Sequence, residues 1–184
     1  MRPLERVHIF GAAGCGSTTL GRALARRLEY QHLDTDDVYW LPSDPPYQAR
    51  RPVPDRVRAL EDATRWTRCW VLSGSLIAWG DALVPSFDLV VFLHVPREIR
   101  MARLRKRERE RFGAEIDPGG SMYHRHRTFL GWAAGYDTGM GGRTLETDAN
   151  WLAQLTCSVL PITGESSTLH QVDAILSFWA RARS

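Results

Sequence analysis

The sequence predicts an α/β fold of three layers, with a five-stranded parallel sheet between helices on both faces and a small arginine-rich lid. Short apolar segments alternate with helical patterns along the 184 residues, and a glycine-rich loop joins the first apolar segment to the first helical pattern. With 43% hydrophobic residues, the chain is long enough for one sizeable core and too short for two ordinary domains. We therefore expect a single domain over residues 1–184.

Five short apolar segments are predicted as strands, at residues 7–10, 32–34, 69–72, 89–95 and 158–162. Helical spacing of apolar residues predicts helices at 17–28, 55–68, 96–112, 144–155 and 168–182. Strands that alternate with helices form parallel sheets covered on both faces. The segment 113–142 is rich in glycine and polar residues, and we expect it to be a mobile excursion rather than part of the core.

Composition excludes several classes of protein. No apolar run approaches the roughly 20 residues of a membrane span, and residues 1–6 lack the apolar region of a signal peptide, so we expect a cytoplasmic protein without a membrane partner. Cys15, Cys69 and Cys157 show no paired spacing and are expected to be reduced thiols. The net charge is +3, and basic residues gather at 97–111 with acidic residues between them. This pattern favours a local anionic ligand over nucleic acid.

The glycine-rich loop carries the chemistry. It fits the pattern G-x-x-x-x-G-K-[ST] at Gly11, Gly16 and Thr18, with Ser17 where lysine is expected. Glycines let backbone N–H groups converge on phosphate oxygens, the following helix adds its positive end, and a threonine hydroxyl suits Mg²⁺. The alternative is an ordinary glycine-rich turn, but the order of strand, loop and helix favours the P-loop NTPase fold. The predicted ligand is ATP or GTP with Mg²⁺, bound by Gly11, Ala12, Ala13, Gly14, Cys15, Gly16, Ser17, Thr18 and Thr19.

Three segments resemble a known family. They are GAAGCGSTTL at 11–20, HLDTDD at 32–37, and FDLVVFLHVP at 87–96 followed by RLRKR at 103–107. In these segments the chain resembles the P-loop small-molecule kinases of the adenylate kinase and shikimate kinase group, including bacterial adenylate kinase-related and topology modulation proteins. The resemblance covers nearly the whole length. It implies an ATP-dependent phosphotransferase that uses Mg²⁺ and a small-molecule acceptor.

The same resemblance implies that Arg103 and Arg107 are catalytic. In the family, arginines at these positions enter the lid, here about residues 108–142, and clamp the transferring phosphates. Four residues apart on a helix, both guanidinium groups share a face and can reach one polyphosphate. The alternative is a solvated basic helix with arginine–glutamate pairs.

Carboxylates at the end of the second strand complete the predicted site. Asp34 and Asp36 can coordinate Mg²⁺ or accept a proton from a substrate hydroxyl, as the resemblance implies. We expect Thr18 and Asp34 to hold the metal. The alternative is that Asp36 or Asp37 caps the next helix. Ser73 stands where many nucleoside monophosphate kinases have an aspartate, which favours a metal site served by Asp34 or Asp36.

The missing lysine leaves two functions open. Ser17 supplies no charge against a triphosphate, and the only lysine of the chain, Lys106, lies in the lid-side helix. Either Arg103 or Arg107 takes over the electrostatic role in a kinase, or the protein is a nucleotide-binding regulatory or sensor module without efficient transfer. DNA binding by the basic segment 97–111 is the least favoured interpretation. The sequence identifies neither the acceptor nor an oligomeric state.

Overall fold

The computed structural model describes residues 3–164 and 166–182. Its centre is a five-stranded sheet in which every pair of neighbouring strands is parallel, in the order β2-β3-β1-β4-β5. The strands are β1 (Arg6–Gly11), β2 (Gln31–Asp34), β3 (Trp70–Ser73), β4 (Leu89–His94) and β5 (Ser158–Thr163). The predicted α/β fold with a five-stranded parallel sheet is confirmed.

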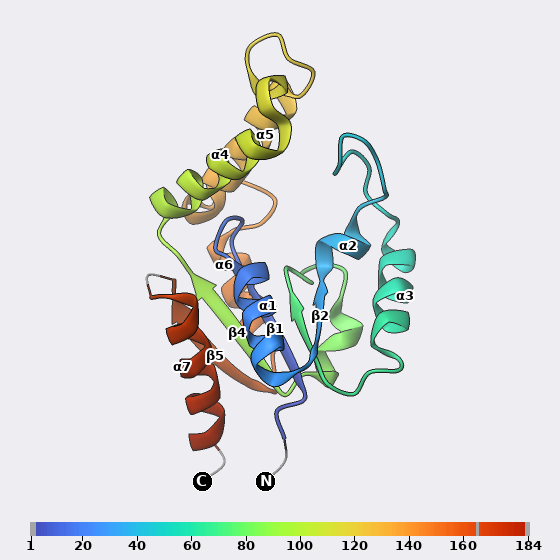
Figure 1. Cartoon of the computed structure of the whole chain (residues 1–184), viewed down its shortest axis with the longest axis vertical. Helices are drawn as coiled ribbons and strands as arrows, with labels where there is room; N and C mark the ends of the chain where they lie inside the picture. Colours follow the sequence, from blue (N-terminus) through green and yellow to red (C-terminus); the bar gives the residue numbers. More distant parts are fainter. Residues whose placement is uncertain (1–2, 165, 183–184) are drawn as a thin grey trace.

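Helices connect the strands. The α-helices are α1 (Ser17–Leu28), α2 (Thr35–Tyr39), α3 (Val53–Thr64), α4 (Arg97–Phe112), α5 (Tyr123–Ala134), α6 (Leu145–Leu152) and α7 (Thr168–Arg181). Three short 3-10 helices are η1 (Asp81–Ser86), η2 (Gly113–Ile116) and η3 (Gly135–Thr138). In Figure 1, α4 and α5 extend beyond the sheet at the end opposite the two chain termini. Across 3–164 and 166–182, no helix combines the length and the apolar character that crossing a membrane requires.

The two faces of the sheet are packed differently. Because alternate side chains of a strand point to opposite faces, Val7 and Ile9 lie on one face and His8 and Phe10 on the other. The first face packs against α1 and α7 and is mainly aliphatic. The second packs against α3, η1 and α6 and holds most of the aromatic core.

His8 is an unusual member of the aromatic face. It is fully buried and stacks between Phe10 and Phe87, with ring centroids 5.3 and 5.1 Å away. Neither ring nitrogen has a hydrogen-bond partner in the described part of the chain. Burial lowers the pKa of His8 to about 3 because a charged imidazolium would lose its hydration there. His8 is therefore a neutral core residue at ordinary pH.

Two helical segments differ from the sequence-based expectations. The helix α3 begins at Val53, directly after Pro52, and ends at Thr64 rather than near residue 68. The helix therefore ends about one turn earlier than the spacing of apolar residues had indicated. The helix α2 follows β2 without a loop and has five residues, too few to show a helical period in the sequence.

The segment 113–142 holds a helix that packs against α4. Its glycines gather near the ends of the segment, and Gly131 alone lies inside α5. The sequence of α5 can therefore form a regular helix. Ala133 is buried in a cluster with Met101 and Leu104 of α4. The segment does project beyond the sheet, but its helix α5 packs against α4 in a small apolar cluster of its own.

Candidate active site

The predicted phosphate-binding loop runs from the end of β1 at Gly11 to the start of α1 at Ser17. Gly14 and Gly16 have φ values of +82° and +97°, a left-handed conformation that residues with a Cβ disfavour. Gly16 is also the N-cap of α1. The first N–H groups of a helix lack partners within it, so the loop has the geometry of an anion site at a helix N-terminus.

Three arginines donate to carbonyl oxygens at alternate positions of this loop. The bonds run from Arg143 Nη2 to Gly11 (3.1 Å), from Arg100 Nη1 to Ala13 (3.3 Å) and from Arg103 Nη1 to Cys15 (3.2 Å). These bonds fix the loop's backbone. They also place three guanidinium charges around a loop that has no lysine.

Arg100 is committed entirely to the protein. Its side chain is 0% exposed, and it donates to the carbonyls of Val95 (3.0 Å) and Ala133 (3.4 Å) as well as to the loop. It also forms an ion pair with Asp137 of η3. Sequence reasoning missed this residue, although its place three residues before Arg103 puts both on one side of α4.

Arg143 is held by a buried carboxylate of α6. Asp148 of α6 is fully buried and accepts two bonds of 2.7 Å, from Arg143 Nε and Nη2. The Tyr136 hydroxyl of η3 donates to the same carboxylate at 2.7 Å. Burial, followed by the charge of Asp148, raises the pKa of Tyr136. No sequence signal predicts this contact, because Arg143 lies 132 residues beyond Gly11.

The two predicted lid arginines are separated in the structure. Arg103 lies at the loop and is exposed apart from its bond to Cys15. Arg107 is 3.4 Å from Glu108 and its guanidinium lies 5.9 Å from the Phe129 ring. The charge of Arg107 partly offsets the raised pKa of Asp36. Arg107 therefore lies toward the end of β2. Of these two predicted lid arginines, Arg103 contacts the phosphate-binding loop and Arg107 does not within the described residues.

Ser17 is turned toward its own loop. Its backbone and hydroxyl hydrogen-bond the Cys15 thiol and lower that group's pKa, although burial raises the pKa of Cys15 more. The positive charges closest to the loop are those of the three arginines. Arg143 and Arg100 also act on the pKa of Cys15 through their charges, as expected for groups beside the loop.

Asp34 and Thr18 lie together. The Thr18 hydroxyl donates to Asp34 Oδ2 at 2.8 Å, and Asp34 Oδ1 accepts the backbone N–H of Asp36 at 3.1 Å. Asp34 is therefore the N-cap of α2. The alternative in which Asp36 or Asp37 caps this helix is not realised, because β2 ends at Asp34 and α2 begins at the next residue.

Asp36 lies in the first turn of α2 and faces the lid. Desolvation, followed by repulsion from Asp34, raises its pKa, while a hydrogen bond with Trp40 and the charges of Arg107 and Arg111 oppose the shift. A carboxyl with a raised pKa is better suited than an ordinary one to accept a proton near neutral pH. Asp36 is exposed by surface area although neighbouring atoms crowd its carboxyl group, so a ligand can still reach it.

The lid also contacts the segment that follows α2. The Arg111 guanidinium lies 4.6 Å from the Tyr47 ring, and Arg125 of α5 donates to the carbonyl of Gln48 at 2.7 Å and to its side-chain oxygen. These contacts join the segment after α2 to the two lid helices on the side of Asp36 where Arg111 lies. Sequence reasoning did not predict these contacts.

The predicted metal ligands fit a magnesium ion bound with a nucleotide. A hydroxyl and a carboxylate oxygen converge at the end of β2, and Mg²⁺ is usually held by one or two protein oxygens together with phosphates and waters. In residues 3–164 and 166–182 no three His, Cys, Asp or Glu side chains gather as a metal cage. The site therefore suits a metal that arrives with a polyphosphate.

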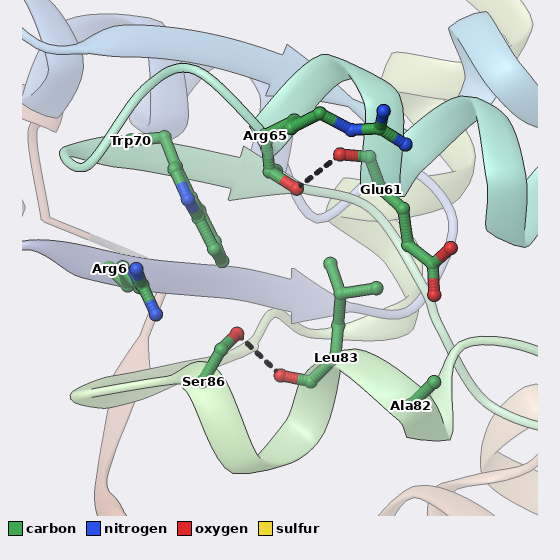
Figure 2. Close-up of a pocket in the computed structure, with 8 residues that line it drawn as sticks. Arg6, Glu61, Arg65, Trp70, Ala82, Leu83 and Ser86 are labelled. Carbon is green, nitrogen blue, oxygen red and sulfur yellow. Dashed lines mark hydrogen bonds between the residues drawn. The ribbon is translucent and has the colours of Figure 1, made fainter.

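A separate pocket lies at the other end of the sheet. Its lining includes Arg6 and Trp70, the first residues of β1 and β3, together with Leu83 and Ser86 of η1 (Figure 2). The Ser86 hydroxyl already donates to the Leu83 carbonyl at 2.6 Å. This pocket is remote from the loop that follows β1.

Comparisons with known proteins identify relatives of this chain. No protein-family model matches the chain. It is 44% identical over 175 residues to the uncharacterized protein YqaC of Bacillus subtilis, covering 95% of this chain and 97% of YqaC. It is 34% identical over 111 residues to the shikimate kinase of Nitratidesulfovibrio vulgaris, covering 54% of this chain and 62% of the kinase.

A solved structure gives the same fold. The shikimate kinase of Acinetobacter baumannii, in complex with shikimate, matches with a TM-score of 0.60 and 16% identity, covering 97% of this chain and 94% of the kinase. At that identity the match concerns the fold alone. The chain is thus related to small-molecule kinases, and it belongs to the family of Bacillus subtilis YqaC, with the P-loop fold of the shikimate kinases.

Proposed function

We propose that the protein is a kinase that transfers the γ-phosphoryl group of ATP to a hydroxyl group of a small molecule. The observation that carries the proposal is the placement of Thr18 and Asp34 beside a loop that Arg103 also contacts. An oxygen pair for Mg²⁺ and a cation for the phosphates are the two parts that phosphoryl transfer requires.

Each residue has a distinct role in this proposal. The loop N–H groups bind the phosphates, and Thr18 with Asp34 would hold the Mg²⁺, which neutralises phosphate charge when bound. Asp36 accepts the proton of the acceptor hydroxyl. That oxygen forms the new bond to the γ-phosphorus as the bond to the β–γ bridging oxygen breaks, and the electron pair leaves with ADP. Arg103 supplies the charge that the missing lysine would have supplied.

The acceptor approaches Asp36 from the side enclosed by the lid. Arg107 and Arg111 act on Asp36 electrostatically, and Tyr47 lies beneath Arg111. Two guanidinium groups at this entrance suit an acceptor with an anionic group. The relationship to the shikimate kinases supports a small hydroxylated acceptor, although the matched kinase segment covers only about half of this chain.

A second function, nucleotide binding without turnover, is favoured by one observation. The Ser17 hydroxyl is paired with the Cys15 thiol, so the position of the usual lysine offers no charge to the phosphates. In that case the arginines would hold a nucleotide without promoting transfer.

Steady-state turnover separates the two functions. ATP and GTP are each supplied with Mg²⁺ and a panel of small hydroxylated acids, sugars and nucleoside monophosphates, and nucleotide affinity is measured by calorimetry. A kinase gives acceptor-dependent ADP, which Asp36→Asn abolishes while nucleotide affinity stays within about twofold. Its activity should fall with decreasing pH as Asp36 is protonated, at a higher pH than for an ordinary carboxyl because its pKa is raised. Tight binding without turnover for every acceptor supports the sensor function.

A further inference from the structure

Two residues behind Asp34 form a hydrogen-bonded chain to it. Asp34 and Ser73 are register partners on the neighbouring parallel strands β2 and β3. His32 precedes Asp34 by two residues and therefore lies on the same face of β2. Ser73 Oγ is 3.0 Å from His32 Nε2 and 3.1 Å from Asp34 Oδ2.

The direction of this chain follows from the chemistry of its members. The Ser73 hydroxyl can donate to Asp34 Oδ2 at 3.1 Å or to the Leu33 carbonyl at 3.4 Å, and the closer, charged acceptor takes its single proton. The Ser73 oxygen then accepts from His32, which must carry a hydrogen on Nε2. Asp34 Oδ2 also accepts from Thr18, and Oδ1 accepts from the Asp36 N–H. Both carboxylate oxygens are thereby fixed in direction.

Packing leaves this chain little freedom. Ser73 is fully buried, and α1 crosses directly over it. The backbone of Gly21 comes so close that a Cβ there would lie 2.9 Å from His32 Nε2 and 3.1 Å from the Ser73 Cβ. Any larger residue at position 21 would push into the His32–Ser73 pair. The same helix begins with Thr18, so the chain and the hydroxyl that meets Asp34 share one rigid support.

We propose that His32 is a positioning residue that acts through Ser73 to aim Asp34 Oδ2 at the cation bound beside Thr18. The inference rests on the proposed nucleotide–metal site but not on phosphoryl transfer. It also assigns a role to Ser73, which stands where a carboxylate was expected. Its hydroxyl orients the one carboxylate present instead of adding a second. Residues that orient metal ligands in this way typically change metal affinity by 10- to 100-fold.

The test measures cation binding directly. Mn²⁺ is titrated by electron paramagnetic resonance into protein saturated with a non-hydrolysable ATP analogue, and metal-free nucleotide affinity is measured by calorimetry. His32→Leu, which has no donor, should weaken Mn²⁺ binding about tenfold. His32→Gln, whose amide can replace the Nε2–H donor, should stay within about threefold of wild type. Gln31→Ala changes an exposed residue of the same strand whose side chain lies on the opposite face from His32, so it is the matched control and should change nothing.

Ser73→Ala removes only an oxygen and tests the middle of the chain. It should weaken Mn²⁺ binding to a similar degree, and the double variant with His32→Leu should lose no more than either single variant, since both break one path. Wild-type Mn²⁺ affinity in a folded His32→Leu protein would overturn the inference. So would an equal loss of metal-free nucleotide affinity, which would indicate a general distortion. Failure of wild type to bind Mn²⁺ with nucleotide would instead overturn the proposed site itself, and this inference with it.

Discussion

Arg100 and Arg103 lie one turn apart on α4, and both donate to the phosphate-binding loop, yet their surroundings differ. Arg100 is wholly buried, with its donors taken by three carbonyls and by Asp137. Arg103 makes a single hydrogen bond within the described residues and is otherwise open to solvent. The same residue type therefore serves two purposes. A guanidinium saturated by the protein supports the fold, whereas one with unused donors is available to a ligand.

The largest expected effect is on turnover, when the solvent-exposed Arg103 is replaced. Arg103→Ala should lower turnover by about 100- to 1000-fold, the usual loss when one charged donor to a transition state is removed. The free energy of unfolding should change by less than about 0.5 kcal/mol because the side chain is exposed. Steady-state kinetics and urea denaturation measure the two quantities.

Arg105→Ala is the matched control, because this arginine is exposed on the same helix. It should leave turnover unchanged. Equal losses in both variants would mean that α4 contributes only a general positive field, and the contrast drawn here would fail.

The second prediction concerns the contribution of the buried Arg100 to the stability of the fold. Arg100→Leu keeps much of the volume but leaves Asp137 and three carbonyls without their donor, so it should lower the free energy of unfolding by about 3 kcal/mol. The shift should appear as a lower urea midpoint with an unchanged slope. A variant with wild-type stability would show that the Arg100 network contributes little to the fold.

His8 extends the comparison to a buried polar group whose ring nitrogens make no hydrogen bond of good geometry in the described residues, although the Leu72 backbone partly offsets the effect of burial on its pKa. Its pKa is about 3 in the folded protein and about 6.5 when unfolded, so between these values the unfolded chain binds more protons and stability falls as pH falls. The loss between pH 7 and pH 5 should be about 2 kcal/mol. His8→Phe should remove this part of the pH dependence. Identical slopes of unfolding free energy against pH in both proteins would contradict the assignment.

The smallest expected effect is on ATP affinity, when Ser17 of the phosphate-binding loop is replaced. Ser17→Lys places a cation at the position that lacks one and should tighten ATP binding without acceptor by about 1 kcal/mol, roughly fivefold. Turnover need not rise, because a lysine that stabilises bound ATP and the transition state equally does not lower the barrier. Calorimetry with Ser17→Ala as control checks the affinity. An unchanged affinity would show that residue 17 does not face the phosphates.

Much of the fold was predictable because strands and helices repeat with different periods. The sheet and the loop between β1 and α1 follow from the apolar segments and the glycines. The different positions of Arg103, at the phosphate-binding loop, and Arg107, beside Glu108 and Phe129, were not predictable. Two residues that are four positions apart on a helix share a face but lie about 6 Å apart along its axis. That distance lets their side chains reach different parts of a site.

Contacts between distant segments were also hidden from the sequence. Arg143 meets Gly11 only because α6 and η3 return to the end of β1. Asp34, rather than the later carboxylates Asp36 and Asp37, caps α2 because the helix follows the strand without a loop. In both cases the decisive information is where an element ends in space, which local patterns do not contain.

The root of the lid is fastened to the loop at two points. Tyr136 and Asp137 are consecutive in η3, and each leads to a different arginine: Asp137 to Arg100 directly, and Tyr136 to Arg143 through the carboxylate of α6. The η3 turn therefore connects both arginines, and through them the phosphate-binding loop, to the base of the lid. The loop's carbonyls are therefore held from the base of the lid as well as from α4 itself, which keeps the phosphate-binding backbone in one shape.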